Sequence, residues 1–189
     1  MKKTTIILFF LMFSTLAYSQ FRGRETWVFS AGINVLDNSA FQDPLKGTEK
    51  WSFNNPFTFG AEYRFDEDFT ISPMLSFNSI DEVYEDGAHG GRGIIEGGTY
   101  VSFDVNAKFY FDEYIAENEN LDAFVGLGAG YYNVADESNG SGNVALGLRY
   151  WFSPQWGLRI QSLAKFAFDN DKVYANNNFI HSLEVLYRL

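Results

Sequence analysis

The segment Pro56–Phe65 reads PFTFGAEYRF, so apolar and polar residues alternate along it. One parity holds apolar side chains, and they are Phe57, Phe59, Ala61, Tyr63 and Phe65. The other parity holds small or polar residues, and they are Thr58, Gly60, Glu62 and Arg64. Because a strand sends successive side chains to opposite faces, this segment predicts a strand with one aromatic and one charged face. The face that points outward decides the class of protein.

Eight segments of this kind follow one another along the chain, and no helical periodicity competes with them over a long stretch. Each has about the 9–11 residues that a tilted strand needs to cross a bilayer. The eight predicted strands are Thr26–Leu36, Pro56–Phe65, Phe69–Ser79, Thr99–Phe111, Asp122–Asn133, Asn143–Phe152, Gly157–Phe168 and Asn178–Leu189.

The connections between these strands alternate in length. The first, third, fifth and seventh are long and rich in Gly, Asn, Asp and Ser, and they are Asp37–Asn55, Ile80–Gly98, Val134–Gly142 and Asp169–Asn177. Two others are tight turns, Asp66–Asp68 and Ser153–Trp156, and Asp112–Leu121 is intermediate. Long loops at one end and short turns at the other predict an up-and-down antiparallel meander.

The apolar parity is nearly complete on all eight strands. Away from the strand ends its polar exceptions are Ser162 and His181, and no Asp, Glu, Lys or Arg falls on it. A soluble sandwich also alternates, but lipid penalises a charge at mid-bilayer by roughly 2–4 kcal/mol, which explains this exclusion. We therefore expect an all-β fold, a closed eight-stranded antiparallel up-and-down transmembrane β-barrel over residues 26–189, with no unpaired edge in lipid.

The N-terminal segment predicts export. Lys2 and Lys3 precede the apolar run Ile6–Phe13, and small residues follow at Ala17 and Ser19. This is the pattern of a secretory signal peptide over residues 1–19, with cleavage between Ser19 and Gln20 and a short segment at 20–25 before the barrel. The chain has no Cys, so it offers no lipid-modified Cys, disulfide or thiolate metal site.

The charge and the composition of the chain limit the kinds of partner that it can bind. Without Lys2 and Lys3 the chain keeps 12 of its 14 Lys and Arg against 24 Asp and Glu, a net charge of −12, which excludes a basic footprint for nucleic acid. Aromatic residues make up 19% of the chain and gather near both ends of the strands, for example Trp156 at the turn end and Phe166 at the loop end. Two interfacial girdles are expected from this arrangement.

Pro73 lies in mid-strand without an N–H to donate, so we expect a bulge or a locally unpaired donor there.

Three stretches carry a family resemblance: the signal end Tyr18-Ser19-Gln20, the turn Tyr150–Arg159 (YWFSPQWGLR) and the terminus Tyr187-Arg188-Leu189. With the whole-chain pattern they resemble small outer-membrane barrels of the OmpX/OmpA-like type, of the kind found in Bacteroidetes. The resemblance implies an integral bacterial outer-membrane protein with periplasmic termini and extracellular long loops. It also implies contact with outer-membrane lipid and lipopolysaccharide and with the insertion machinery. Such barrels usually end in an aromatic residue, whereas this chain ends in Leu189.

The inward parity carries a candidate charge network. Its nine members are Glu62, Arg64, Asp104, Lys108, Arg149, Arg159, Lys165, Glu184 and Arg188. Glu62 with Arg64, Asp104 with Lys108, and Glu184 with Arg188 share a face of one strand, which suggests three pairs. An eight-stranded barrel is just wide enough for its side chains, so these charges must be paired to be tolerated. The six bases exceed the three acids by three, so Tyr110, Tyr132, water or a turn carboxylate such as Asp66 is expected to join.

The sequence offers little for catalysis or metal binding. Some eight-stranded barrels act on lipid A with a His and a Ser on the outer wall, but Ser182 is adjacent to His181 and faces the other way. His89 lies in a Gly-rich stretch without a partner at metal spacing, so we predict no catalytic residue, metal or cofactor. The loop Ile80–Gly98 has a net charge of −4, which suits solvation, or a cation-bridged contact with lipopolysaccharide, or a protein partner.

The sequence thus predicts a non-enzymatic outer-membrane barrel with a side-chain-filled lumen. It would contribute to envelope integrity or to surface interaction through acidic extracellular loops. The alternative is an accessory subunit of a larger secretion or assembly machine, docked through its lipid-facing wall or the turn Asp112–Leu121. A lipid A-modifying enzyme and a small ion channel are less favoured.

Overall fold

The structure is a computed structural model that describes residues 27–37, 51–66, 68–84, 94–111, 120–172 and 174–189. The predicted signal peptide at 1–19, its cleavage site, the segment 20–25 and His89 lie outside these residues. The described strands are β1 (Trp27–Asp37), β2 (Trp51–Ser52), β3 (Asn54–Arg64), β4 (Phe69–Tyr84), β5 (Ile94–Tyr110), β6 (Leu121–Val134), β7 (Glu137–Trp151), β8 (Trp156–Ala167) and β9 (Asn178–Arg188).

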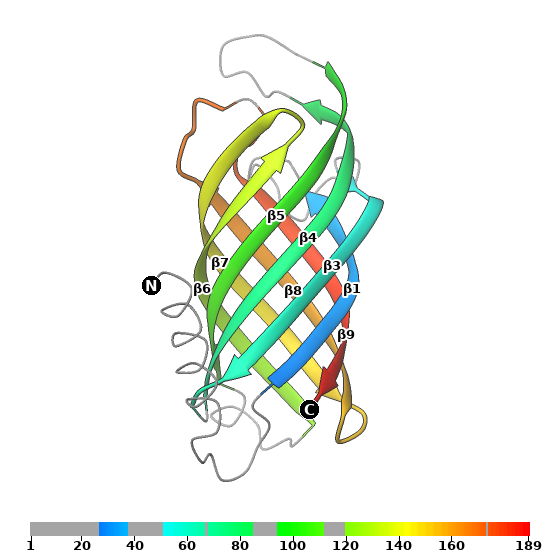
Figure 1. Cartoon of the computed structure of the whole chain (residues 1–189), viewed down its shortest axis with the longest axis vertical. Helices are drawn as coiled ribbons and strands as arrows, with labels where there is room; N and C mark the ends of the chain where they lie inside the picture. The colour runs from blue at the N-terminus through cyan, green and yellow to red at the C-terminus, as the bar shows by residue number, and fades with distance from the viewer. Residues whose placement is uncertain (1–26, 38–50, 67, 85–93, 112–119, 173) are drawn as a thin grey trace, which may run out of the picture.

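Eight of these strands form a closed antiparallel barrel (Figure 1). Each of β1 and β3 to β9 pairs with its neighbour, and β1 also pairs with β9 over ten positions, from Val28↔Arg188 to Asp37↔Phe179. The two-residue β2 pairs with the end of β1 through Asp37↔Trp51. The predicted eight-stranded up-and-down barrel is confirmed. No helix among the described residues is long and apolar enough to span a membrane.

The fifth connection differs from the prediction. Val134–Gly142 was expected to be a long loop, but β6 and β7 run on to a turn at Ala135 and Asp136, with Ala135 at a φ of 53°. A strand ladder is held by backbone hydrogen bonds, so it does not require the apolar side chains that this stretch lacks. The third connection is shortened in the same way, because β4 reaches Tyr84 and β5 begins at Ile94.

Pro73 does not introduce a bulge. It pairs with Val105 of β5, while the register with β3 is the same on both sides of it, at Gly60↔Met74 and Tyr63↔Ile71. Between these two pairs, Pro73 and its neighbour on β4 have no partner on β3, as expected because Pro73 has no N–H to donate. The register shift of this sheet lies instead between Asn54 and Phe57, beside Asn55, whose φ is 52°.

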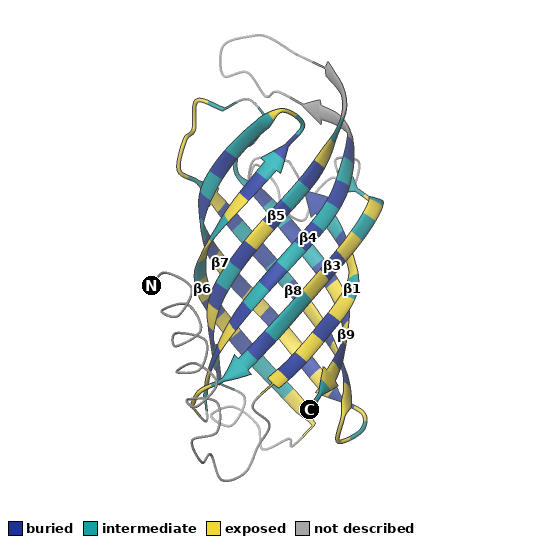
Figure 2. Cartoon of the chain, viewed as in Figure 1, coloured by how far each residue is buried: buried dark blue, intermediate teal, exposed yellow. Residues whose placement is uncertain are grey.

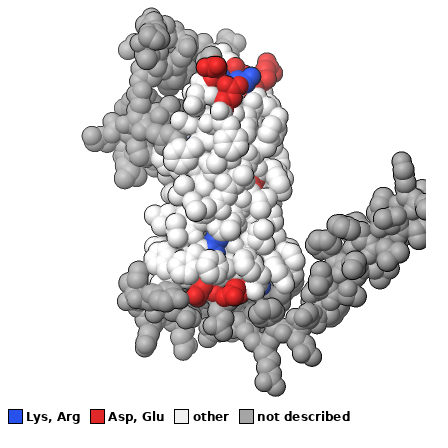
Figure 3. Space-filling view, turned by 90° about the vertical axis from the view of Figure 1, so that its left-hand side faces the viewer, with Lys and Arg blue, Asp and Glu red and all other residues white. Residues whose placement is uncertain are grey.

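The two faces of the barrel differ sharply in exposure (Figure 2). Outward side chains are apolar and open, with Leu127 65%, Leu146 59% and Ile160 59% exposed. Inward side chains are buried even where they carry charge, and Lys165 and Glu184 have no exposed surface. Figure 3 shows acidic side chains gathered at the two ends of one face and a largely uncharged band between them. The predicted apolar-out arrangement is confirmed.

Candidate functional site: the lumen and the outer wall

One carboxylate organises the charges of the lumen. Glu62, on β3, accepts from Lys108 Nζ at 3.1 Å, Arg159 Nη1 at 2.9 Å and Arg149 Nη1 at 3.0 Å. The hydroxyl of Tyr110 donates to the same carboxylate at 2.6 Å. The donors come from β5, β7 and β8, so Glu62 ties together strands from all round the barrel. All five side chains are buried, and charge-assisted bonds of this kind are the strong ones.

Two more carboxylates complete this cluster. Arg159 Nη2 donates to Glu184 of β9 at 2.6 Å, and the hydroxyl of Ser182 donates to the other oxygen of Glu184 at 2.7 Å. Arg149 Nε donates to Asp122, at the start of β6, at 2.5 Å. Each Arg therefore bridges Glu62 to a second acid. We call these residues and Glu62, Lys108 and Tyr110 the Glu62 cluster.

A second ion pair lies nearer the loop end of the lumen. Lys165 of β8 donates to Asp104 of β5, and Asn143 Nδ2 donates to the same carboxylate at 2.8 Å. The hydroxyl of Ser102 donates to its other oxygen at 3.0 Å. Gly130 faces this site, where an added Cβ would lie 1.8 Å from Asp104 Oδ1. A side chain at residue 130 would thus displace the carboxylate.

Two of the predicted same-strand pairs are wrong. Glu62 is not paired with Arg64, nor Asp104 with Lys108; the ion pairs of Glu62, Asp104 and Lys108 join different strands instead. Residues i and i+2 on a strand are separated by two rises of about 3.3 Å, whereas long side chains in a narrow barrel reach across the lumen. Asp122 is a further member, which is not among the nine residues predicted from the sequence. Its inward parity and its place as the first residue of a predicted strand were the signals that could have found it.

Asp122 also settles the charge balance. The buried cations of the two clusters are Lys108, Arg149, Arg159 and Lys165, and the acids bonded to them are Glu62, Asp104, Asp122 and Glu184. Every buried cation of the lumen clusters therefore has an acid to match it. Tyr110 joins the network as expected, and the Tyr132 ring joins it too, because Lys165 Nζ lies 4.9 Å from its centre. The predicted turn carboxylate Asp66 is exposed at the barrel end.

The remaining two predicted members, Arg64 and Arg188, lie at the turn end of the lumen and are half-buried. The Arg64 guanidinium lies 5.4 Å from the centre of the Tyr110 ring. The Arg188 guanidinium lies 3.5 Å from the centre of the Trp151 ring, and its Nη1 donates to Pro154 O at 3.3 Å. Cation–π contacts of this kind accommodate a charge that is only partly removed from water.

Beside the Asp104–Lys165 pair, the loop-end half of the lumen holds a cluster of neutral groups. Asn34 Nδ2 lies 2.9 Å from Phe57 O, 2.8 Å from Thr58 Oγ1 and 2.9 Å from Phe77 O. Asn78 Nδ2 donates to Asn34 Oδ1 at 2.7 Å. We call Asn34, Thr58, Ser76 and Asn78 the amide cluster; Thr58 and Ser76 share a hydroxyl contact of 3.2 Å.

Residues that follow β8 close over the lumen at its loop end. The hydroxyl of Tyr132 donates to the carbonyl oxygens of Ala175 at 3.0 Å and Asn176 at 2.8 Å. Asn139 Nδ2 donates to Ala175 O at 2.7 Å, and Ala175 is fully buried. Buried side chains therefore occupy the lumen at both ends, and this segment covers them at the loop end. Within the described residues no group of three or more His, Asp or Glu is placed to hold a metal ion.

The outer wall holds a pair that sequence reasoning missed. His181 of β9 and Ser162 of β8 face each other across the strands, and Ser162 Oγ lies 2.8 Å from His181 Nδ1. The expectation that His181 has no Ser on its face is therefore wrong. That expectation considered only neighbours on the same strand, whereas the two polar exceptions of the apolar parity are cross-strand partners. Their pairing depends on the β8–β9 register, which the sequence does not state.

Comparison with known proteins shows which solved structures share this fold. No family profile matches this chain, and no curated protein matches it. Among solved structures it is similar to Ail, the attachment invasion locus protein of Yersinia pestis, with a TM-score of 0.52 and 16% identity over 88% of this chain and 100% of Ail. It is also similar to the N-terminal β-barrel domain of Pseudomonas aeruginosa OprF, with a TM-score of 0.53 and 12% identity over 87% of this chain and 98% of that domain.

A third similar structure is the outer membrane protein AlkL, with a TM-score of 0.55 and 15% identity over 90% of this chain and 93% of AlkL. The chain therefore has the small eight-stranded fold of transmembrane β-barrels. At this level of identity the likeness concerns the fold, and the Bacteroidetes part of the sequence resemblance stays a prediction.

Proposed function

We propose that this chain is a non-enzymatic integral protein of a bacterial outer membrane, with a closed lumen, periplasmic termini and extracellular loops. The observation that carries the proposal is the combination of an exposed apolar outer face with a lumen filled by matched charges. Such a molecule does not need a pore for its work. It would contribute to envelope integrity or make surface contacts through its loops.

The filled lumen speaks against a channel. Lys108, Arg159 and Glu184 are each at most 2% exposed. Lys108 and Arg159 share the carboxylate of Glu62, and Arg159 also bonds Glu184, so a passing ion would have to break these bonds. We expect the purified protein to give no sustained open channels in planar lipid bilayers. Sustained single-channel currents that vary with the dose of protein would contradict the closed lumen.

The apolar wall provides the test of membrane insertion. Leu127 is 65% exposed on the outward face of β6. A charge placed there would cost roughly 2–4 kcal/mol at mid-bilayer, so Leu127→Arg should impair folding into vesicles, measured as heat-modifiable migration on gels. Leu127→Val is the matched control and should fold normally. Normal assembly of the Arg variant would contradict lipid exposure of this wall.

The Ser162–His181 pair does not make an enzyme of this barrel. Acyl transfer needs hydrogen-bond donors aimed at the developing oxyanion as well as a nucleophile and a base. Ser162 pairs with Leu146 on one side and with His181 on the other, so the backbone around it is engaged in the sheet. Unchanged lipid A in mass spectra of cells with and without the protein is the expected result, and loss of an acyl chain would contradict it.

The negative charge of the loops favours partners other than polyanions such as sulfated sugars. One structure of Ail holds the heparin analogue sucrose octasulfate. In this chain the segment Ile80–Gly98 has a net charge of −4, which repels a sulfated sugar. A protein partner or divalent cations that bridge to lipopolysaccharide suit an acidic surface better. Co-purification in mild detergent separates the lone barrel from the accessory subunit, because only the latter retains a stoichiometric partner.

A further inference from the structure

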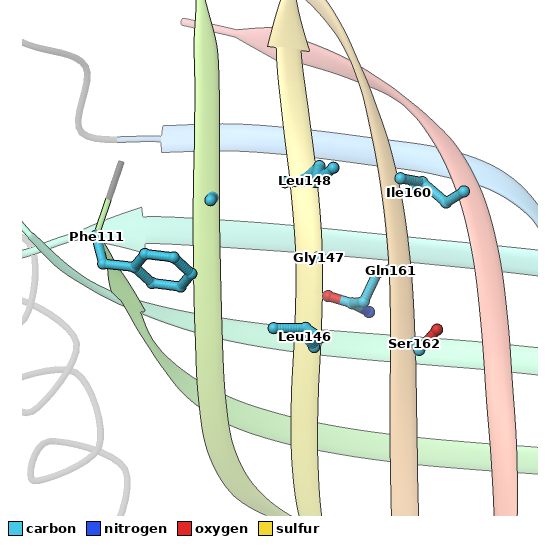
Figure 4. A pocket seen from close by; sticks show the side chains of 8 residues that line it. Phe111, Leu146, Gly147, Leu148, Ile160, Gln161 and Ser162 are labelled. Atoms are coloured by element: carbon cyan, nitrogen blue, oxygen red, sulfur yellow. The ribbon is translucent and has the colours of Figure 1, made fainter. Parts of the chain in front are cut away.

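A groove runs along the outer wall where β6, β7 and β8 lie side by side (Figure 4). Its volume is about 350 Å³, within the range of about 300–1,000 Å³ that is usual for small-molecule sites. Leu146, Leu148 and Ile160 form its walls, and all three are large and exposed. Ala123 and Ser162 also line it. The wall is hollow here because these two small outward residues stand beside three large ones.

Ser162 is both a lining residue of the groove and the partner of His181. On its other side the His181 ring packs against aromatic rings, 5.4 Å from that of Trp51 and 5.9 Å from that of Phe179. His181 Nε2 is buried there and has no hydrogen-bond partner among the described residues.

This environment indicates which ring nitrogen of His181 carries the hydrogen. A neutral His carries one N–H, at Nδ1 or at Nε2. A buried N–H without an acceptor is rarer and more costly than an under-satisfied acceptor, so the N–H belongs on Nδ1. His181 then donates to Ser162 Oγ, and the hydroxyl hydrogen of Ser162 is left to donate elsewhere. The groove that Ser162 lines is where an acceptor could receive it.

The position of Ser162 along β8 sets the depth of that acceptor. Ser162 lies four residues from Phe166 at the loop end and six from Trp156 at the turn end, all on the outward parity. At about 3.3 Å per residue and a tilt near 45°, four residues correspond to a depth of about 9 Å below Phe166. If Phe166 marks the interface, headgroups and ester linkages lie above this level. An acceptor at Ser162 must therefore sit on the acyl chain itself.

We propose that this groove is a binding site for one hydroxylated acyl chain of an outer-leaflet lipid, whose hydroxyl oxygen accepts from Ser162. The rest of the chain lies against Leu146, Leu148 and Ile160. The proposal rests on the membrane location proposed above and goes beyond it, because that location requires only that lipid covers the wall. It makes Ser162 and His181 a recognition pair in a wall that is otherwise apolar.

The test compares two lysophosphatidylcholines that differ only by a hydroxyl, which one of them carries in the middle of its tetradecanoyl chain, well below the ester linkage and at the depth of Ser162. Binding to the full-length protein in mild detergent is measured by native mass spectrometry. One hydrogen bond adds about 0.5–1.5 kcal/mol, so the wild-type protein should prefer the hydroxylated lipid by roughly two- to tenfold. Ser162→Ala should bind both lipids equally.

Two further variants locate the site. Ala123→Leu fills the groove without adding charge and should weaken the binding of both lipids, whereas Val144→Ala, an outward residue outside the groove, should behave as wild type. The absence of a preference in the wild type, a preference kept by Ser162→Ala, or unaltered binding to Ala123→Leu would each overturn the proposal. Heat-modifiable migration of every variant is recorded in parallel. A loss of migration in the wild type itself would instead overturn the membrane location.

Discussion

The two halves of the lumen are filled in different ways. At the turn end, Glu62 accepts from three cations and a tyrosine. At the loop end, Asn34 and its neighbours exchange neutral hydrogen bonds, for example from Asn78 Nδ2 to Asn34 Oδ1 at 2.7 Å. Both arrangements are buried and both connect strands that are distant in sequence. The difference is what remains when one member is removed: uncompensated ions in the Glu62 cluster, and unsatisfied dipoles in the amide cluster.

The largest effect is expected from Glu62→Gln. This change leaves Lys108, Arg149 and Arg159 with one acid fewer, and an uncompensated buried charge costs roughly 3–5 kcal/mol. We expect the free energy of unfolding to fall by about that amount, measured by urea unfolding of the barrel in phospholipid vesicles. Arg64→Gln is the control, because Arg64 is half-buried at the lumen end, and it should cost under about 1 kcal/mol. A wild-type midpoint for Glu62→Gln would show that Glu62 does not organise this half.

The Asp104–Lys165 pair is expected to give the next largest effect. Asp104→Asn or Lys165→Met alone leaves one buried ion without its partner, at a cost of roughly 3 kcal/mol, the lower end of the range for a broken buried pair. The double variant removes both ions, so its loss should be smaller than the sum of the two by about 1–3 kcal/mol. The measurement is the same urea unfolding, analysed as a double-mutant cycle. Additive losses would mean that the two charges do not interact, and that the loop-end half is held by its neutral bonds alone.

The contrast between the two halves also separates what the sequence predicts from what it does not. The inward parity identified nine charged residues, because alternation is a local property of each strand. It did not identify their partners, since the Glu62 contacts depend on how strands in all parts of the barrel are staggered. For the same reason Ser162 and His181 were each noticed and were not paired. Val134–Gly142 was predicted as a loop because its composition is that of loops, whereas the β6–β7 pairing that makes it a strand is not local.

The amide cluster should give the smallest effect. Asn34→Ala removes an amide whose Nδ2 lies within 2.9 Å of three oxygen acceptors, on Phe57, Thr58 and Phe77. Two of these acceptors are backbone carbonyls in the sheet, which keep part of their hydrogen bonding, so the loss should be about 1–2 kcal/mol. Ser76→Ala is the matched control, since its hydroxyl contact with Thr58 is 3.2 Å long, and it should cost less still. If Asn34→Ala destabilises the barrel as much as Glu62→Gln does, net charge is not what distinguishes the two halves, and the number of strands that each side chain connects becomes the better explanation.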